Sequence, residues 1–417
     1  MPTTTQQTSV LERFLRYVKL DTTSDPDSPT LPSTSKQLML LDLLVSELKG
    51  LGLRDAERDR FGIVMATLTS TSTNYKAPTI GFLAHVDTSP EMSGTGVKPI
   101  VHRDYDGRDL VLPDDPSAVL SPREDADLAG KLGEDIVTAS GTTLLGADDK
   151  SGVAVVMAAV EHLVKNPSIP HGPIRISFTP DEEIGRGVRQ FDVKRFGARC
   201  AYTLDGAGLG TLEAETFSAD SMTVTFQGRN THPGFAHGVM VNAVKVAADF
   251  VNRLPKDTLS PETTKDRDGF VHPNGITASV DRTSVHFIIR DFDTANLAVK
   301  EDLLKKLAHD TARDWPGSSA SFEVKESYRN MRDVVAKHPE ILELARGAMR
   351  KAGVTPIEGR IRGGTDGSIL SEMGLPTPNL FSGQHRFHSR LEWVSVQDME
   401  IAVKVVVNLA QLWEQET

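Results

Sequence analysis

The sequence has a single cysteine, few aromatic residues and no long hydrophobic run. Cys200 is the only cysteine among 417 residues, which excludes an intramolecular disulfide and favours a reducing compartment. No apolar run approaches the ~18 residues that span a bilayer. The first residues, MPTTTQQTSVLERF, lack the basic and apolar segments of a signal peptide. These absences predict a soluble cytoplasmic protein.

Positive charge is also in deficit, with 46 basic against 57 acidic residues and a net charge of −11. An acidic chain is a poor partner for nucleic acid or an anionic membrane, so neither is expected. The hydrophobic content of 39% and the charged content of 25% are those of a globular protein. A chain of 417 residues exceeds the usual size of one core, which predicts two domains.

Short apolar strands alternate with helical segments in the first half of the chain. Buried strands are expected at residues 79–84, 174–178 and 201–204, and a long apolar helix at 152–164 lies between the first two. This alternation predicts an α/β fold in which helices cover the sheet. In such sheets, binding sites form just beyond the carboxyl ends of the strands.

The region from residue 217 to residue 328 has a different pattern. Its order of strand, helix, two strands, helix and strand predicts a small α+β domain with a split, ferredoxin-like sheet. It lies between two α/β portions, residues 1–216 and 329–417, so we predict an inserted domain. Residues 104–135, which are acidic and contain several prolines, are expected to form a long loop near the site.

Acidic residues and histidines occur where strands end and helices begin. His85 and Asp87, in FLAHVDTSP, follow a predicted strand. Because residues two apart on a strand share one side, Asp87 is placed to orient His85 while the imidazole binds a metal. Asp148, in LLGADDKSGVAVVMAAV, opens the long apolar helix. Taken alone, these residues equally fit a polar strand end and an ordinary helix N-terminus.

A second acidic group follows the next strands. Asp181, Glu182 and Glu183 are adjacent in FTPDEEIG, and Asp205 closes the short strand in YTLDG. Three adjacent acids repel one another at neutral pH unless a cation or a proton is present. A solvated turn is the alternative for the triplet alone.

The segment HRFHSRLEW, near the end of the sequence, adds His388 and, four residues later, Glu392 as a further candidate ligand. His385 lies in the same segment and is expected to be exposed. Two histidines and at least three carboxylates, with no thiolate, suit Zn²⁺ and, less selectively, Co²⁺ or Mn²⁺. Their joint occurrence predicts a metal centre at one edge of the sheet.

The motifs resemble those of a known superfamily. HVDTSP, LLGADDKSG, PDEEIG, TLDG and HSRLE, in this order, are similar to those of the two-zinc aminopeptidases, deacylases and carboxypeptidases. Within it, the resemblance is to the peptidase T family of tripeptide aminopeptidases, through NTHPGFAHGVMVNA (230–243), FIIRDFD (287–293) and RGGTDGS (362–368). It implies a zinc-exopeptidase-like catalytic domain, a mixed sheet flanked by helices, with an inserted lid domain.

The resemblance also implies roles for the site residues. Asp148 would bridge two zinc ions. Each ion would have two further ligands, His85 and Asp205 for the first and Glu183 and His388 for the second. Glu182 would be the general base, Asp87 would hold His85, and the peptide bond between Asp148 and Asp149 would be cis.

Residues of the inserted domain and of a later loop are implied to contact substrate. These are His232, Asn242, Arg290, Arg362 and Gly364. His232 would stabilise the oxyanion and Arg290 would pair with the substrate's terminal carboxylate. A structural turn, a helix cap, a solvated strand face and a plain loop are the respective alternatives for His232, Asn242, Arg290 and Gly364. One departure from the family is the run Gly383-Gln384-His385-Arg386, where a Gly-Tyr-Asn-like run is usual.

The function that the resemblance implies is removal of the N-terminal residue from tripeptides. A carboxypeptidase, a dipeptidase or an N-acyl amino acid deacylase on the same scaffold is the alternative, because substrate choice depends on the pocket rather than on the fold. A metal-binding protein without catalytic activity is a third possibility, which a complete ligand set with Glu182 disfavours. The expected partner is a small peptide, and relatives suggest a homodimer formed through the inserted domain.

Overall fold

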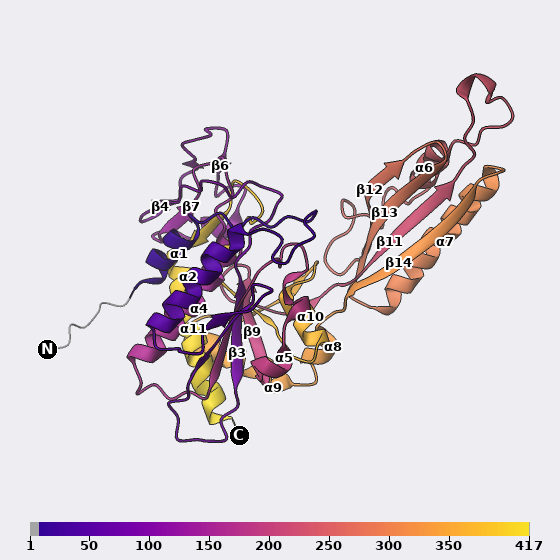
Figure 1. Cartoon of the computed structure of the whole chain (residues 1–417). Helices are drawn as coiled ribbons and strands as arrows, with labels where there is room; N and C mark the ends of the chain where they lie inside the picture. Colours follow the sequence, from indigo (N-terminus) through magenta and orange to yellow (C-terminus); the bar gives the residue numbers. More distant parts are fainter. Residues whose placement is uncertain (1–7, 417) are drawn as a thin grey trace. The chain divides into compact units, whose positions relative to one another are not determined.

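The computed structural model describes residues 8–416, which form two compact units (Figure 1). The first unit contains the described residues up to 214, residues 331–360 and the residues from 365 onward. The second unit contains residues 215–330 and also the short segment 361–364. The predicted insertion, residues 217–328, lies within the second unit. The sequence pattern did not indicate that segment 361–364 would join it.

The first unit is built on an eight-stranded sheet, in the order β1-β2-β8-β3-β9-β16-β10-β15. In chain order, its strands are β1 (Glu57–Arg58), β2 (Val64–Leu68), β3 (Ile80–His85), β8 (Ile174–Thr179), β9 (Cys200–Gly206), β10 (Thr211–Thr216), β15 (Ile357–Ile361) and β16 (Asn379–Phe381). The central strands β8, β3, β9 and β16 are parallel to their neighbours in that run, whereas β2 and β10 pair antiparallel. The sheet is therefore mixed, and the predicted α/β class is confirmed.

Helices flank this sheet. The longer ones are α1 (Val10–Tyr17), α2 (Lys36–Gly50), α4 (Ala147–Lys165), α9 (Pro339–Lys351), α10 (Asp366–Glu372) and α11 (Val396–Gln415), and the short ones are α5 (Val193–Phe196), α8 (Arg332–Val335) and the 3-10 turn η1 (Gly187–Gln190). Helix α4 lies on β3 and β9, and α1 and α11 pack against it (Figure 1). Its alanine- and valine-rich sequence is buried almost throughout because it is covered on all sides. Among the described residues, no helix has the length and hydropathy to cross a membrane.

A second sheet in the first unit joins segments that are far apart in the chain. Its order is β17-β18-β7-β4, formed by β4 (Ile100–His102), β7 (Ile136–Thr138), β17 (Gln384–His385) and β18 (Trp393–Ser395). The expectation of a plain loop at 104–135 is wrong. This segment contains the hairpin β5 (Leu110–Val111) and β6 (Val119–Leu120) and the helical turn α3 (Ala126–Ala129). Its few apolar side chains are too sparse for a periodic pattern, yet Leu120 and Leu128 pack with Trp393 in a separate small core.

The second unit has one antiparallel sheet, in the order β12-β13-β11-β14. Its elements are β11 (Ser218–Gln227), the turn η2 (Pro233–Phe235), α6 (Ala243–Asn252), β12 (Phe270–Ala278), β13 (Arg282–Asp291), α7 (Ala295–Asp314) and β14 (Ser319–Tyr328). Chain order and sheet order are those of a split β-α-β arrangement. Phe226, Phe250 and Phe287 are buried in its own hydrophobic core, between the sheet and the helices.

The close contact of α4 with β9 makes a testable prediction at Gly152. A Cβ atom added there would lie 2.2 Å from the carbonyl oxygen of Leu204 and 2.3 Å from Oδ1 of Asp149. Gly152→Ala should therefore lower the free energy of unfolding by about 1–3 kcal/mol, the usual effect of overpacking a core. In the control Gly50→Ala, at the end of α2, the added atom meets nothing within 4 Å. Equal denaturant midpoints for the two variants would contradict this packing.

Candidate metal centre

The predicted site residues of the first unit meet at one edge of its sheet. His85 is the last residue of β3, Asp205 lies near the end of β9, and the acidic triplet begins two residues after β8. Because β8, β3 and β9 are parallel neighbours, their carboxyl ends lie side by side. Asp148 reaches the same place from the first turn of α4, which lies on β3 and β9.

Asp148 stands between two histidines. Its Oδ1 lies 3.0 Å from Nε2 of His85, and its Oδ2 lies 3.3 Å from Nε2 of His388. The remaining acids flank this arrangement: Oδ1 of Asp205 lies 3.6 Å from Nε2 of His85, and Oε2 of Glu183 lies 2.8 Å from Nε2 of His388. Each set of three donors, His85–Asp148–Asp205 and Asp148–Glu183–His388, lies within 4.8 Å. The structure thus brings together the five residues that the resemblance implied as ligands.

These donors fit divalent cations. Oε1 of Glu183 is buried and has no hydrogen-bond partner. Burial and the charge of Asp148 raise the pKa of Glu183 to about 8, because a second buried carboxylate is unfavourable without a cation. Burial alone would lower the pKa of His388, but its hydrogen bonds to Asp148 and Glu183 raise it to about 11. Imidazole nitrogens and carboxylate oxygens without a thiolate are a donor set that suits Zn²⁺.

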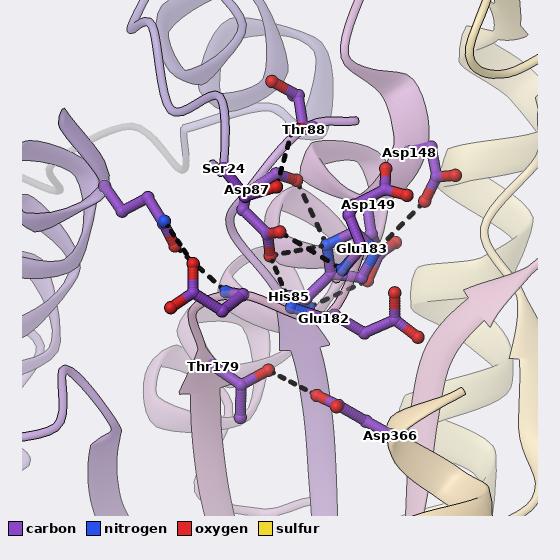
Figure 2. A network of polar contacts seen from close by, with 12 residues as sticks. Ser24, His85, Asp87, Thr88, Asp148, Asp149, Thr179, Glu182, Glu183 and Asp366 are labelled. Atoms are coloured by element: carbon purple, nitrogen blue, oxygen red, sulfur yellow. Dashed lines mark hydrogen bonds and ion pairs between the residues drawn. The ribbon is translucent and has the colours of Figure 1, made fainter. Parts of the chain in front are cut away.

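Asp87 supports both the histidine and the acidic triplet. Its Oδ1 lies 3.3 Å from Nδ1 of His85, so the carboxylate orients the imidazole. The same carboxylate accepts the backbone N–H groups of Glu182 at 3.0 Å and Glu183 at 3.2 Å (Figure 2). Its role in holding His85 therefore extends to holding the turn that carries both glutamates.

The peptide bond between Asp148 and Asp149 is cis, as the resemblance implied. The Asp149 carboxylate is buried and accepts the backbone N–H groups of His85 and Gly152, each at 3.2 Å. Asp149 thus ties β3 to the start of α4. Lys150, also buried, donates from Nζ to the carbonyl of Leu20 at 2.8 Å. Burial lowers its pKa to about 8.

Two expectations for the segment after β17 are wrong. Glu392 was a further candidate ligand, but its carboxylate accepts the backbone N–H groups of Leu145, Gly146 and Asp148 and lies outside both donor sets. His385 was expected to be exposed, but it is buried and stacks on the Trp393 ring with centroids 3.9 Å apart. The imidazole of His385 is shielded from water because it stacks on the indole of Trp393, and the sequence does not show that these two rings meet.

The run that departs from the family, Gly383-Gln384-His385-Arg386, has partners of its own. Gln384 Nε2 lies 3.2 Å from the carbonyl oxygen of Asp205 and 3.3 Å from its Oδ1. Arg386 donates from Nε to Oδ2 of Asp125 at 2.7 Å and from Nη2 to the carbonyl of Glu124 at 2.6 Å. The run therefore ties the His388 segment to the residue before α3 and contacts a predicted metal ligand.

Three acids near the site were not assigned a role from the sequence. Oε2 of Glu91 lies 3.2 Å from Nδ1 of His388. Asp366, at the start of α10, accepts the hydroxyl of Thr179 at 2.7 Å (Figure 2). Asp181 has a positive φ of 56° and is buried, and it accepts the N–H and the hydroxyl of Ser33. Asp181 was visible in the sequence as the first acid of the triplet, and Asp366 lies in the motif RGGTDGS, whereas Glu91 carried no signal.

His232 and Asn242, both predicted to bind substrate, lie in the second unit and cap local structure there. Nδ1 of His232 accepts the backbone N–H of Gly234 at 3.1 Å, before the turn η2. Because Nδ1 is an acceptor, the proton of the neutral ring is on Nε2. Asn242 Oδ1 accepts the N–H of Val244 at 2.9 Å and caps α6, which is the structural alternative for this residue.

The two predicted substrate arginines have different surroundings within the second unit. Arg362 donates from Nη1 to the carbonyls of Asp266 and Asp268, at 2.9 and 2.8 Å, so much of its guanidinium is occupied. Arg290 has a buried Nε without a hydrogen-bond partner. Gly364 lies against the Tyr328 ring, where an added Cβ would be 2.5 Å from a ring carbon. Gly364 thus permits close packing against that ring.

The chain is similar to one family model and to curated relatives over nearly its whole length. The model of peptidase family M20/M25/M40 matches residues 141–412. A Peptidase T of Geobacillus thermodenitrificans is 46% identical over 408 residues, which cover 98% of this chain and 99% of that protein. A Peptidase T of Bacillus subtilis is 46% identical over 405 residues, which cover 97% and 98%.

Solved structures show the same fold. An aminopeptidase PepT from Bacillus cereus matches with a TM-score of 0.74 at 24% identity, covering 98% of this chain and 99% of that one. A tripeptidase from Staphylococcus aureus matches with a TM-score of 0.75 at 21% identity, covering 99% of both chains. A dinuclear metal-binding peptidase of the M20 family from Bacillus subtilis matches with a TM-score of 0.65 at 14% identity, covering 98% of both.

The buried charges predict how stability without metal depends on pH. The folded pKa of Glu183, about 8, exceeds its ordinary 4.5, and that of His388, about 11, exceeds 6.5. Between pH 6.5 and 8 the folded state therefore binds more protons than the unfolded state, so its stability falls as the pH rises. The lowered pKa values of His385, about 4, and Lys150, about 8, act mainly outside this range.

Thermal unfolding of protein stripped of metal by a chelator checks this prediction. The melting temperature should be lower at pH 8 than at pH 6.5, and the gain on adding Zn²⁺ should be larger at pH 8. The Zn²⁺-loaded protein serves as the control for general effects of pH. If the metal-free melting temperature is equal or higher at pH 8, the folded state does not bind more protons than the unfolded state in this range, and the prediction is wrong.

Proposed function

This chain belongs to peptidase family M20/M25/M40, and we propose that it is a metal-dependent aminopeptidase that removes the N-terminal residue of tripeptides. The observation that carries the proposal is the pair of donor sets that share Asp148. Relatives named Peptidase T, 46% identical over nearly the whole chain, support the aminopeptidase activity. A neighbour of the same fold named as a tripeptidase supports the length of the substrate.

We propose that the two donor sets described above bind one metal ion each. His85, Asp148 and Asp205 would hold one ion, and Asp148, Glu183 and His388 the other. The dinuclear metal-binding peptidase of the same fold supports two ions, and the donor chemistry supports zinc. Bound there, the ions would lower the pKa of water toward neutrality and polarise the scissile carbonyl.

Glu182 is the proposed general base. It would take a proton from the attacking water and deliver it to the leaving amine. Its backbone N–H is held by Asp87, which supports a fixed position for the side chain. Burial raises the pKa of Glu182 above its ordinary value, which is the direction in which enzymes shift a glutamate that acts as a general base.

The second unit is proposed to act as a lid that contributes to substrate binding and as the surface of a homodimer. His232 is proposed to donate from Nε2 to the oxyanion, a role that its hydrogen bond from Gly234 supports by leaving the proton on Nε2. Arg290 is the proposed partner of the substrate carboxylate. The contacts of Arg362 with backbone carbonyls favour a structural role over its predicted contact with substrate.

The single buried Cys200 suits the reducing cytoplasm, where we propose that the enzyme acts.

Loss of Glu182 should remove catalysis without removing metal. In Glu182→Ala, kcat on a tripeptide should fall by about 10²–10⁴-fold, the usual contribution of general acid–base catalysis. Elemental analysis should find the same metal content as in the wild type, because Glu182 lies outside both donor sets. Glu372→Ala, an exposed acid at the end of α10, is the control and should keep full activity. Unchanged hydrolysis in Glu182→Ala would reject Glu182 as the base.

A substrate panel separates the aminopeptidase from its alternatives. The metal-loaded enzyme should cleave free tripeptides faster than dipeptides or N-acyl amino acids, and the first product should be the N-terminal residue. Chelation should abolish hydrolysis, and added Zn²⁺ should restore it. Release of the C-terminal residue would identify a carboxypeptidase, and a preference for N-acyl amino acids would identify a deacylase. Either result would reject the proposal.

A further inference from the structure

We propose that Glu392 is a positioning residue of the metal centre, which holds in place the backbone that carries the shared ligand Asp148. The inference rests on the metal centre proposed above. It assigns to Glu392 a role other than that of a ligand, and it concerns the affinity of the centre for its ions rather than the chemical step.

The Glu392 carboxylate is fully engaged with one short segment of backbone. Its Oε2 accepts the N–H groups of Leu145 at 2.7 Å and Gly146 at 2.8 Å, and its Oε1 accepts the N–H of Asp148 at 2.9 Å. The side chain is 1% exposed, so water does not compete for these hydrogen bonds. Hydrogen bonds to an ionised acceptor are about twice as strong as neutral ones.

The irregular backbone that leads into α4 depends on this carboxylate, because Asp148 and Asp149 have non-helical backbone angles. The first N–H groups of a helix have no partner within the helix. The N-cap residue is Gly146, with a φ of 81°, and it has no side chain with which to accept them. Glu392 supplies the acceptor from 244 residues beyond Asp148 in the sequence.

The segment held by Glu392 determines where both oxygens of Asp148 lie. Oδ1 faces His85 and Oδ2 faces His388, so a shift of the 145–148 backbone moves ligand atoms of both donor sets. Glu392 itself is fixed because it directly precedes β18, which pairs with β7 and β17. Loss of its hydrogen bonds should therefore weaken the binding of both ions, whereas loss of the His388 side chain removes a ligand from one donor set only.

Glu392→Gln tests the proposal with little change of shape. Glutamine has one acceptor oxygen and one NH₂ group, so in either orientation a donor faces at least one of the three backbone N–H groups. Metal-free variants are titrated with Zn²⁺ by calorimetry. We expect about 10–100-fold weaker binding of both ions, the usual effect of removing a group that supports metal ligands. In His388→Ala, the larger loss should fall on one ion.

Glu161→Gln is the matched control. Glu161 is also a buried acid of α4, but it pairs with Arg13 at 2.9 Å and Lys165 at 2.7 Å and lies outside both donor sets. This variant should lose stability and keep the wild-type affinities for Zn²⁺. If Glu392→Gln does not fold, Glu392→Asp takes its place, because it keeps the charge but is too short to reach all three N–H groups.

Asp148→Asn separates a failure of this inference from a failure of the proposed function. If it binds two Zn²⁺ ions as tightly as the wild type, Asp148 is not the shared ligand and the proposed metal centre is wrong. If it loses affinity for both ions while the Glu392 variant binds both normally, only the positioning role is wrong. If the Glu392 substitution weakened the binding of only one of the two ions, the positioning role would also be wrong.

Discussion

The site depends on the placement of one carboxylate, that of Asp148, between the buried His85 and the half-buried His388 and among other acids. Its two oxygens face His85 and His388, and Asp205 and Glu183 complete the two donor sets around it. Burial, and after it the nearby charge of Asp148, raises the pKa of Glu183 to about 8. Such a cluster is stable at neutral pH when divalent cations share it. The same group of carboxylates therefore raises the pKa of Glu183 in the metal-free protein and provides the ligands for the ions that the proposed reaction needs.

Other acids around Asp148 hold the backbone rather than act as ligands. Asp87 accepts the N–H groups of Glu182 and Glu183, and Asp149 accepts that of His85. Glu392 accepts the N–H groups of Leu145 and Gly146, just before α4, and that of Asp148. Each of these bonds joins segments that are distant in the sequence, so the ligands are fixed by several elements at once. Rigid placement of this kind is what an active site needs to bind ions and to position a base.

Much of this arrangement could be predicted from the sequence, because strands and helices are local patterns and ligands follow the ends of parallel strands. The α/β class and the residues of both donor sets were predicted on this basis and by resemblance. The role of Glu392 and the burial of His385 were not predicted. Whether an acid binds a metal or holds backbone depends on which N–H groups face it, as those of the 145–148 segment face Glu392. Whether a histidine is buried depends on what covers it, as Trp393 covers His385. Those partners come from distant segments. The structure in residues 104–135 was missed because a few scattered apolar residues show no periodicity.

The most direct test of the central claim is anomalous diffraction from crystals of the Zn²⁺-loaded protein, measured on both sides of the zinc absorption edge. The account predicts two peaks in the first unit, each at about 2.0–2.2 Å from a different oxygen of Asp148. One peak should also lie beside His85 and Asp205, and the other beside Glu183 and His388. A single peak, or two peaks with Asp148 bound to neither, would contradict the shared carboxylate on which the proposed function rests.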